Sequence, residues 1–287
     1  MEPSIVELVL PAGEVAYPIE LGNLPAVHLI VRGTGAGTVL REPIEVRGVA
    51  SVEVRDLRFG ELIWSFSDAL TLRATHSISL HNVAFLDQRG TYQTTSHGVT
   101  PFDFVASLET GNGGAIHLSD VSLLGARGAW PAIRMVAPGG TVAITRTLVA
   151  DTDRPPFFVG IADTITVEDS VLFLPAGTKD LLVTNWPPDG VTFRRSTIVA
   201  DTPEVLVAPG NNPQTPPSLW MPTVLSDSTL YTRGPDPGNG PGLTLERSTI
   251  ESAPTTQPDF AAVRTRAEAL APVERAAILP LLDLQAP

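Results

Sequence analysis

The chain has 287 residues, of which 43% are hydrophobic and only 17% charged, so one large core can form without division into several domains. Its formal net charge of −12 disfavours nucleic acid as a partner, since nucleic-acid binders normally carry a basic face. The absence of cysteine excludes disulfides, thiolate catalysis and zinc–thiolate sites, and no apolar run reaches the roughly 18 residues that a membrane span requires.

The N-terminal segment predicts the first strands of a repetitive fold. Its opening residues lack a basic stretch, an apolar run and a small-residue cleavage site, so no signal peptide is seen. We therefore expect a cytoplasmic protein, or part of a particle that is assembled in the cytoplasm. An apolar stretch ending at Leu10 is followed by a Pro11-Ala12-Gly13 turn, and a second apolar run covers residues 27–31.

An eight-residue pattern then recurs along the chain: alternating apolar residues, a polar fifth residue, and further apolar residues. It begins at residues 52, 78, 116, 142, 165, 191, 223 and 243. Period-two alternation predicts a strand with one buried face, and a third apolar run precedes several units. Three short strands in 20–26 residues indicate a parallel coil. Hairpin turns are too scarce for a β-sandwich. The sequence predicts an all-β fold, a single right-handed three-faced parallel β-helix solenoid over residues 1–252.

The polar fifth position of each unit is interpreted as a structural ladder. Coils stacked about 4.8 Å apart would place these side chains in one column at a bend. From the third member onward the column alternates acid and base, and each exposed pair of this kind contributes about 0–1 kcal/mol. The ladder consists of Asp56, Asn82, Asp120, Arg146, Asp169, Arg195, Asp227 and Arg247.

Three connections, residues 87–103, 209–222 and 232–242, are longer than a coil requires, and binding sites commonly lie on such loops. The first carries Tyr92 and His97. Trp186 and Trp220 occupy the same connection in successive coils, where they would suit a sugar face or a protein partner. These four residues are the predicted binding residues. Packing of the connections over the core is the alternative interpretation.

The composition changes after Glu251, and residues 253–287 are predicted to form a short helical element. Pro258 and Asp259 are typical of a helix start, and apolar residues follow at helical spacing. The end of a solenoid exposes its apolar core, which a terminal element must cover. We expect a C-terminal helical cap, with docking on a partner chain as the alternative.

The turn at Pro11–Gly13 and the run Val27–Gly35, which ends in Arg-Gly-Thr-Gly, resemble the opening coils of pectin-lyase-like β-helix proteins. With the repeats, this resemblance covers roughly residues 4–252. It implies a superfamily fold that hosts lyases, hydrolases, adhesins and structural pieces, so it does not by itself give a function. Repeat units such as residues 165–171 and 243–250 also resemble β-helix segments of phage tails and contractile injection systems.

Catalytic signatures of the pectinolytic and methylesterase β-helix enzymes are absent, so no motif predicts a catalytic residue. The best remaining carboxylate pair is Asp151 and Asp201, which lie in repeated Val-Ala-Asp-Thr turns two coils apart. The alternative interpretation is that these are Asp-Thr turns whose side chains form hydrogen bonds with the backbone of the turn itself. The five histidines show no common metal-ligand spacing, so neither a metal nor another cofactor is predicted.

The sequence thus favours a non-catalytic structural or binding module with protein partners, as a component of a phage-tail-like or contractile-injection-type assembly. The alternatives are a polysaccharide-active lyase or glycoside hydrolase, which would make polysaccharide a ligand, and a surface adhesin. Whether the chain is an enzyme is left open.

Overall fold

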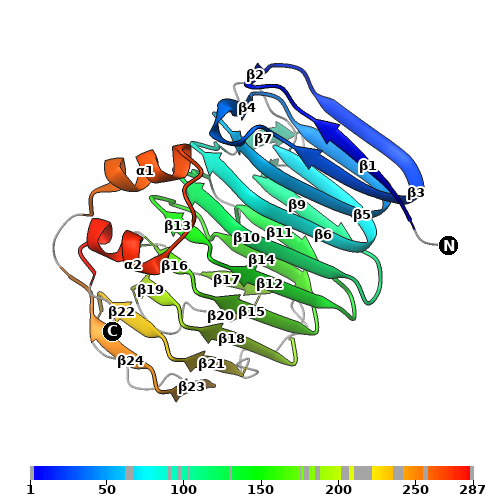
Figure 1. Cartoon of the computed structure of the whole chain (residues 1–287). Helices are drawn as coiled ribbons and strands as arrows, with labels where there is room; N and C mark the ends of the chain where they lie inside the picture. The colour runs from blue at the N-terminus through cyan, green and yellow to red at the C-terminus, as the bar shows by residue number, and fades with distance from the viewer. Residues whose placement is uncertain are drawn as a thin grey trace.

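The structure is a computed structural model, shown in Figure 1, in which the strands lie side by side along the molecule and two short helices lie on one flank. It describes residues 3–61, 68–89, 92–95, 98–101, 104–128, 131–174, 176–177, 181–184, 188–201, 207–209, 222–234, 242–254 and 258–284.

The strands pair in parallel to form three columns, which we name A, B and C. One pass of the chain through A, B and C is called a coil, and each strand pairs with the equivalent strand of the neighbouring coil. For example, Ile116 of column A is paired with Ile78 before it and with Val142 after it. Three long strands, β3 (Ile19–Arg32), β5 (Ile44–Phe59) and β6 (Leu70–Leu86), each run through more than one column. The prediction of a mostly β chain built on a long parallel sheet is therefore confirmed.

Column A contains β1 (Ser4–Val9), the later part of β3, the middle parts of β5 and β6, the start of β10 (Ala115–Leu124), β12 (Thr141–Thr145), β15 (Thr164–Glu168), β18 (Gly190–Arg194), β21 (Thr223–Ser226) and β23 (Leu243–Glu246). Column B contains β2 (Gly13–Val15), β4 (Thr38–Leu40), the ends of β5, β6 and β10, β13 (Leu148–Ala150), β16 (Val171–Phe173), β19 (Thr197–Ala200), β22 (Thr229–Thr232) and β24 (Thr249–Ser252). Column C contains the starts of β3, β5 and β6, then β9 (Ala106–Thr110), β11 (Ile133–Val136), β14 (Phe157–Ile161), β17 (Leu182–Thr184) and β20 (Val207–Pro209).

Between the first and the last described strands of the columns, one 3-10 helix and one pair of strands lie outside the columns. A short 3-10 helix, η1 (Gly35–Gly37), precedes β4. Strands β7 (Tyr92–Thr95) and β8 (Gly98–Pro101) form an antiparallel pair within the connection between β6 and β9. The longest connection predicted from the sequence therefore contains strands of its own.

The inward side chains of all three columns form one continuous apolar core. Alternate residues in each strand point inward, as the period-two pattern predicts, and Val52, Val54 and Ile78 are almost completely buried. Phe59 and Phe85 stack on successive coils with ring centroids 4.9 Å apart. Burial of one such Val, Leu or Phe side chain contributes about 1.5–3 kcal/mol, so the stacked interior is the main source of stability.

The bend from column A to column B is made by one residue in the left-handed conformation. All eight residues of the predicted ladder have positive φ, between 45° and 56°. This conformation costs a residue with a Cβ roughly 1–2 kcal/mol, and Asp and Asn tolerate it best because their short side chains bond locally. The polar fifth position of the repeat thus coincides with the bend.

The C-terminal segment forms α1 (Phe260–Glu268), α2 (Arg275–Ile278) and the 3-10 helix η3 (Leu279–Leu282). Asp259 caps α1 by accepting a hydrogen bond from the backbone N–H of Ala262 at 3.0 Å. The prediction of short C-terminal helices is confirmed. No described helix is long and apolar enough to span a membrane.

These helices do not cover the open end of the last coil, so the predicted end cap is corrected. They fold back along the outer face of column B, as Figure 1 shows. The physical reason lies in the outward residues of that column, which are apolar over several coils and leave a stripe that must be buried. The stripe comprises Ala84, Leu86, Leu124, Leu148, Ala150, Val171, Phe173, Val199 and Tyr231. We name residues 258–284 the strap.

Candidate functional site: the outer face of column C

Column C is the face of the molecule whose edges carry the variable connections. From Asp56 onward, the A-to-B bend takes only one or two residues in each coil. The connections from column B to column C vary in length, and the longest of those between described strands covers residues 87–105, between β6 and β9. The connection from column C to column A after β20 covers residues 210–222. Because long connections on a rigid scaffold usually carry binding residues, column C is the candidate functional face.

Outward residues of column C stand in register, one for each coil. The row runs Glu20, Glu45, Thr71, Ser107, Arg134, Phe158 and Val183. Its first two members lie one strand spacing apart, or about 4.8 Å. The face therefore changes from acidic in the first coils to mixed polar and then apolar further along.

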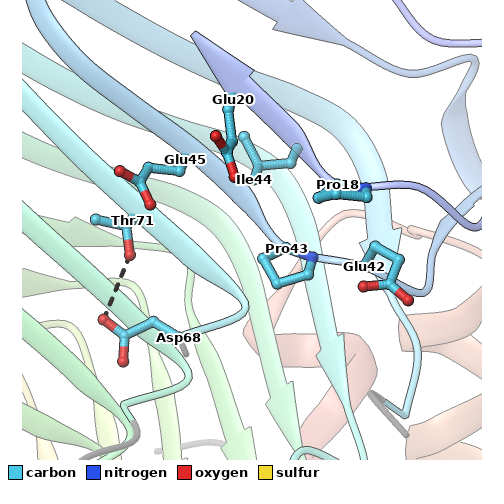
Figure 2. A pocket seen from close by; sticks show the side chains of 8 residues that line it. All are labelled: Pro18, Glu20, Glu42, Pro43, Ile44, Glu45, Asp68 and Thr71. Carbon is cyan, nitrogen blue, oxygen red and sulfur yellow. Dashed lines mark hydrogen bonds between the residues drawn. The ribbon is translucent and has the colours of Figure 1, made fainter. Parts of the chain in front are cut away.

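A hollow of about 270 Å³ opens on the acidic part of this face (Figure 2). It is lined by Pro18, Glu20, Glu42, Pro43, Ile44, Glu45, Asp68 and Thr71. No basic side chain is among these described lining residues. Asp68 is held in place because its carboxylate accepts hydrogen bonds from the backbone N–H of Phe104 at 2.9 Å and from the hydroxyl of Thr71 at 3.4 Å.

Next to the hollow, the middle coils present a polar network. Arg134 donates a hydrogen bond to the hydroxyl of Ser107 at 3.2 Å and lies 3.6 Å from the carboxylate of Glu109. Arg73 reaches the same carboxylate at 3.6 Å. This part of the face offers both donors and acceptors to a ligand.

An aromatic pair completes the face beyond the network. The rings of Phe104 and Phe158 stack with centroids 6.2 Å apart and an interplanar angle of 26°. Phe158 is only 9% exposed and Phe104 is partly exposed, so side chains that accept from hydroxyl groups lie close to a small apolar surface, the combination that suits a sugar ring.

Sequence reasoning did not single out Glu20, Glu45 and Asp68. The signal was present, because Glu20 and Glu45 are 25 residues apart and occupy the same outward position in successive coils. Their backbones lie about one strand spacing (about 4.8 Å) apart, and the carboxyl groups of a retaining glycosidase lie roughly 5–5.5 Å apart. Glu45 also forms an ion pair with Arg47.

The predicted catalytic candidates, Asp151 and Asp201, lie at the B-to-C edge two coils apart, and each is bonded to an arginine. Asp151 accepts a hydrogen bond from Nη2 of Arg127 at 2.6 Å. Asp201 accepts one from Arg233 at 3.1 Å and another from the backbone N–H of Gly177 at 2.7 Å. Both carboxylates thus serve contacts between coils, and neither lines the hollow.

The predicted binding residues cannot be placed on this face by their side chains. Trp186, Trp220 and His97 lie outside the described residues. Tyr92 belongs to β7, whose backbone alone is described. Their role in binding stays a prediction.

The ladder residues form pairs between neighbouring coils. Asn82 donates to Asp56 at 2.8 Å, and Arg146, Arg195 and Arg247 each donate two or more bonds to the aspartate of the preceding coil, with shortest distances of 2.6–2.8 Å. The hydrogen bond from Arg195, supported by the charges of Arg195 and Arg275, holds the pKa of Asp169 below its ordinary value despite partial burial. The same cause, a hydrogen bond from Arg247, lowers the pKa of Asp227.

A row of serine side chains, one residue after the ladder in each of four coils, was not predicted from the sequence. The hydroxyls of Ser170, Ser196, Ser228 and Ser248 each accept a hydrogen bond from the backbone N–H of the equivalent residue in the preceding coil, at 3.0–3.3 Å. The signal was the Asp-Ser or Arg-Ser dipeptide that recurs in four units. This row of serines supplies hydrogen-bond acceptors for buried backbone N–H groups at the bend.

Within the described part of the chain, no group of three or more His, Asp or Glu side chains is arranged to hold a metal ion.

No protein-family model and no curated protein matches the chain. Among solved structures, the chain is similar to the alginate lyase AlyF-OU02, solved as a complex with G6, with a TM-score of 0.42 and 14% sequence identity. The match covers 85% of this chain and 58% of the lyase chain, so the chain spans less than two thirds of the lyase's length. A likeness at this level assigns no activity to the chain.

Proposed function

We propose that the three columns form a right-handed parallel β-helix whose column C face binds a polysaccharide. The observation that carries this proposal is the row of outward side chains, one per coil, that runs between variable connections from the acidic hollow to the Phe104–Phe158 pair. Successive coils repeat at about 4.8 Å, so such a row offers contacts to a linear polymer over several sugar units.

Sugar cleavage is a second candidate function, favoured by the spacing of Glu20 and Glu45. Hydrolysis of a glycosidic bond needs one carboxylic acid to protonate the leaving oxygen and one carboxylate to act as nucleophile or base. Two outward carboxylates on adjacent strands, with Asp68 across the same hollow, supply the required groups. Glycan binding with no cleavage would leave the binding proposal intact and remove this one.

The proposal is tested by affinity electrophoresis against neutral, amino-sugar and uronate polysaccharides, followed by mass spectrometry for shortened chains. We expect retardation of the wild type, and a loss of at least about tenfold in affinity when Glu20 and Glu45 are both changed to glutamine, because hydrogen bonds that an ionised carboxylate accepts are about twice as strong as neutral ones. Glu246→Gln on column A is the matched control and should bind like the wild type. Equal mobility in every gel would refute the proposal.

The hypothesis of a phage-tail-like assembly component has no support in the comparisons and remains a sequence-based prediction. The described structure offers it one feature: on the outer face of β1, the side chains of Ile5 and Val9 are 72% and 50% exposed. Protein partners, a cytoplasmic location and the domain limit at residue 252 likewise remain predictions.

A further inference from the structure

A second hollow, separate from the column C face, lies where the strap meets the first coils of column B. Its volume is about 230 Å³, below the roughly 300–1,000 Å³ of drug-sized sites, so it suits a small ligand. The lining residues are Glu14, Val39, Arg41, Arg58, Gly60, Glu61, Leu86, Asp87, Arg264 and Glu268. The last two belong to α1, so the strap forms one wall.

Arg58 differs from every other charged residue of this hollow. It projects outward from column B between Val39 and Ala84 of the neighbouring coils. Its Nε is buried and has no hydrogen-bond acceptor, and Arg58 has no hydrogen bond or ion pair with any other described residue. Nε of Arg55 and of Arg266 is also without an acceptor, but these two guanidinium groups reach acceptors through other nitrogens.

The acidic residues of the hollow are already paired. Glu14 accepts from Arg41 at 2.8 Å, Asp87 accepts from Arg264 at 2.6 Å, and Glu61 lies 3.4 Å from Arg89. Glu268 lies 3.9 Å from the same Arg264 guanidinium. Among the charged residues that line this hollow, Arg58 is therefore the one that forms no ion pair with a described residue.

Gly60 also lines the hollow. A Cβ built on Gly60 would lie 2.6 Å from Nη1 of Arg41, so a side chain at this position would require the end of the Arg41 side chain to move. A ligand in the hollow that offers acceptor oxygens to the terminal nitrogens of Arg58 supplies hydrogen bonds that no described residue supplies.

We propose that Arg58 is the anchor of a binding site for one carboxylate group, closed on one side by the strap. The planar guanidinium presents paired N–H donors that match a planar carboxylate, which is the geometry of a bidentate bond. The ligand is a small carboxylic acid or the carboxylate of a single uronic sugar. With a protein net charge of −12, non-specific attraction of anions is weak, so saturable binding reports the site itself.

The site is tested by isothermal titration of the whole protein with sodium acetate, glucuronate and phosphate at constant ionic strength, with chloride as reference. We expect saturable binding of a carboxylate, at least about tenfold weaker in Arg58→Gln and intermediate in Arg58→Lys, which keeps the charge without the fork. Arg32→Gln, a variant of an exposed ion-paired arginine on column A, is the control and should bind like the wild type.

Binding of both carboxylates would support a site for small acids, and binding of glucuronate alone would identify a sugar acid. Phosphate binding more tightly than either carboxylate, equal binding by Arg58→Gln, or no saturable carboxylate binding to the wild type would each overturn the proposal. The wild-type titration needs no variant to fold. Because the hollow lies apart from column C, failure here leaves the polysaccharide proposal standing.

Discussion

Arg195 donates hydrogen bonds to both carboxylate oxygens of Asp169 in the preceding coil, from Nε to one oxygen and from Nη2 to the other, each at 2.8 Å. Both residues have positive φ, so each side chain leaves the backbone at an equivalent bend and meets its neighbour along the column. The pair therefore links two coils at the one point where the chain turns most tightly.

The first prediction concerns acid stability. The pKa of Asp87, Asp169 and Asp227 is lowered in the folded protein by hydrogen bonds from Arg264, Arg195 and Arg247. Their stabilising contribution is complete above the ordinary carboxyl pKa of about 3.9 and is lost as the pH falls through the lower folded values. Urea unfolding between about pH 2 and 7 should show the loss below about pH 4, and Asp169→Asn should show a smaller pH dependence than the wild type.

At neutral pH, Asp169→Asn is expected to lower the free energy of unfolding by less than about 1 kcal/mol. The side chains of Asp169 and Arg195 are each more than one-third exposed, so solvent screens their interaction. A cost of several kcal/mol would show that the ladder, and not the buried core, holds the coils together.

The second prediction separates backbone conformation from charge at Arg146, where φ is 45°. Arg146→Asn should change the free energy of unfolding by less than about 1 kcal/mol, because Asn tolerates this conformation and Asn82 already bonds to Asp56 in the same way. Arg146→Val should cost clearly more, since a β-branched side chain is strained at positive φ. Urea denaturation of both variants measures the difference, and equal effects would contradict this account of the bend.

The third prediction concerns the row of serines that follows the ladder. Ser228→Ala removes the acceptor of the buried Ser196 N–H and should cost about 1–3 kcal/mol in the free energy of unfolding. Ser248→Ala removes the equivalent bond at the last described coil, where the site is only partly buried, and should cost less. Thermal unfolding of the two variants checks the order, which would be reversed or absent if the serines only filled space.

The fourth prediction concerns the strap. Ile278 is 1% exposed and packs on the apolar stripe of column B, so Ile278→Ala should cost about 2–5 kcal/mol or detach the strap. A detached strap would expose the stripe and increase binding of a hydrophobic dye, whereas Ala261→Ser on the exposed side of α1 should change neither property. Unchanged dye binding and stability in Ile278→Ala would show that the strap does not depend on this packing.

The strands and bends were predictable because each depends on local pattern. The third apolar run that precedes several repeat units is a strand of column C, as at β11 (Ile133–Val136) and β14 (Phe157–Ile161), and the helix start at Asp259 is the observed cap. The strap's position was not predictable, because helical spacing shows which residues are buried and not which surface covers them. An end cap was expected because the last coil would otherwise expose its apolar core. The strap instead covers the outward apolar residues of column B, which are visible in the sequence but were not recognised as a continuous stripe.

The candidate site depends on contacts that the sequence hides. The proximity of Glu20, Glu42, Glu45 and Asp68 follows only from the register of the coils, whereas the repeated Val-Ala-Asp-Thr motif indicated Asp151 and Asp201 instead. The lack of a partner for Arg58 likewise depends on which arginines reach the four acids around it. Local patterns thus predict the scaffold, while the sites follow from its register.

Carboxylate footprinting with a polysaccharide that retards the protein tests the central claim most directly. The side-chain carboxyl groups are labelled with a water-soluble carbodiimide and an amine, with and without the polysaccharide, and the labelled positions are read by mass spectrometry. The account predicts that Glu20, Glu42, Glu45 and Asp68 are protected, while Glu246 and Glu251, at the far end of columns A and B, are labelled equally in both samples. Protection at Glu246 or Glu251, or none in the column C hollow, would contradict it.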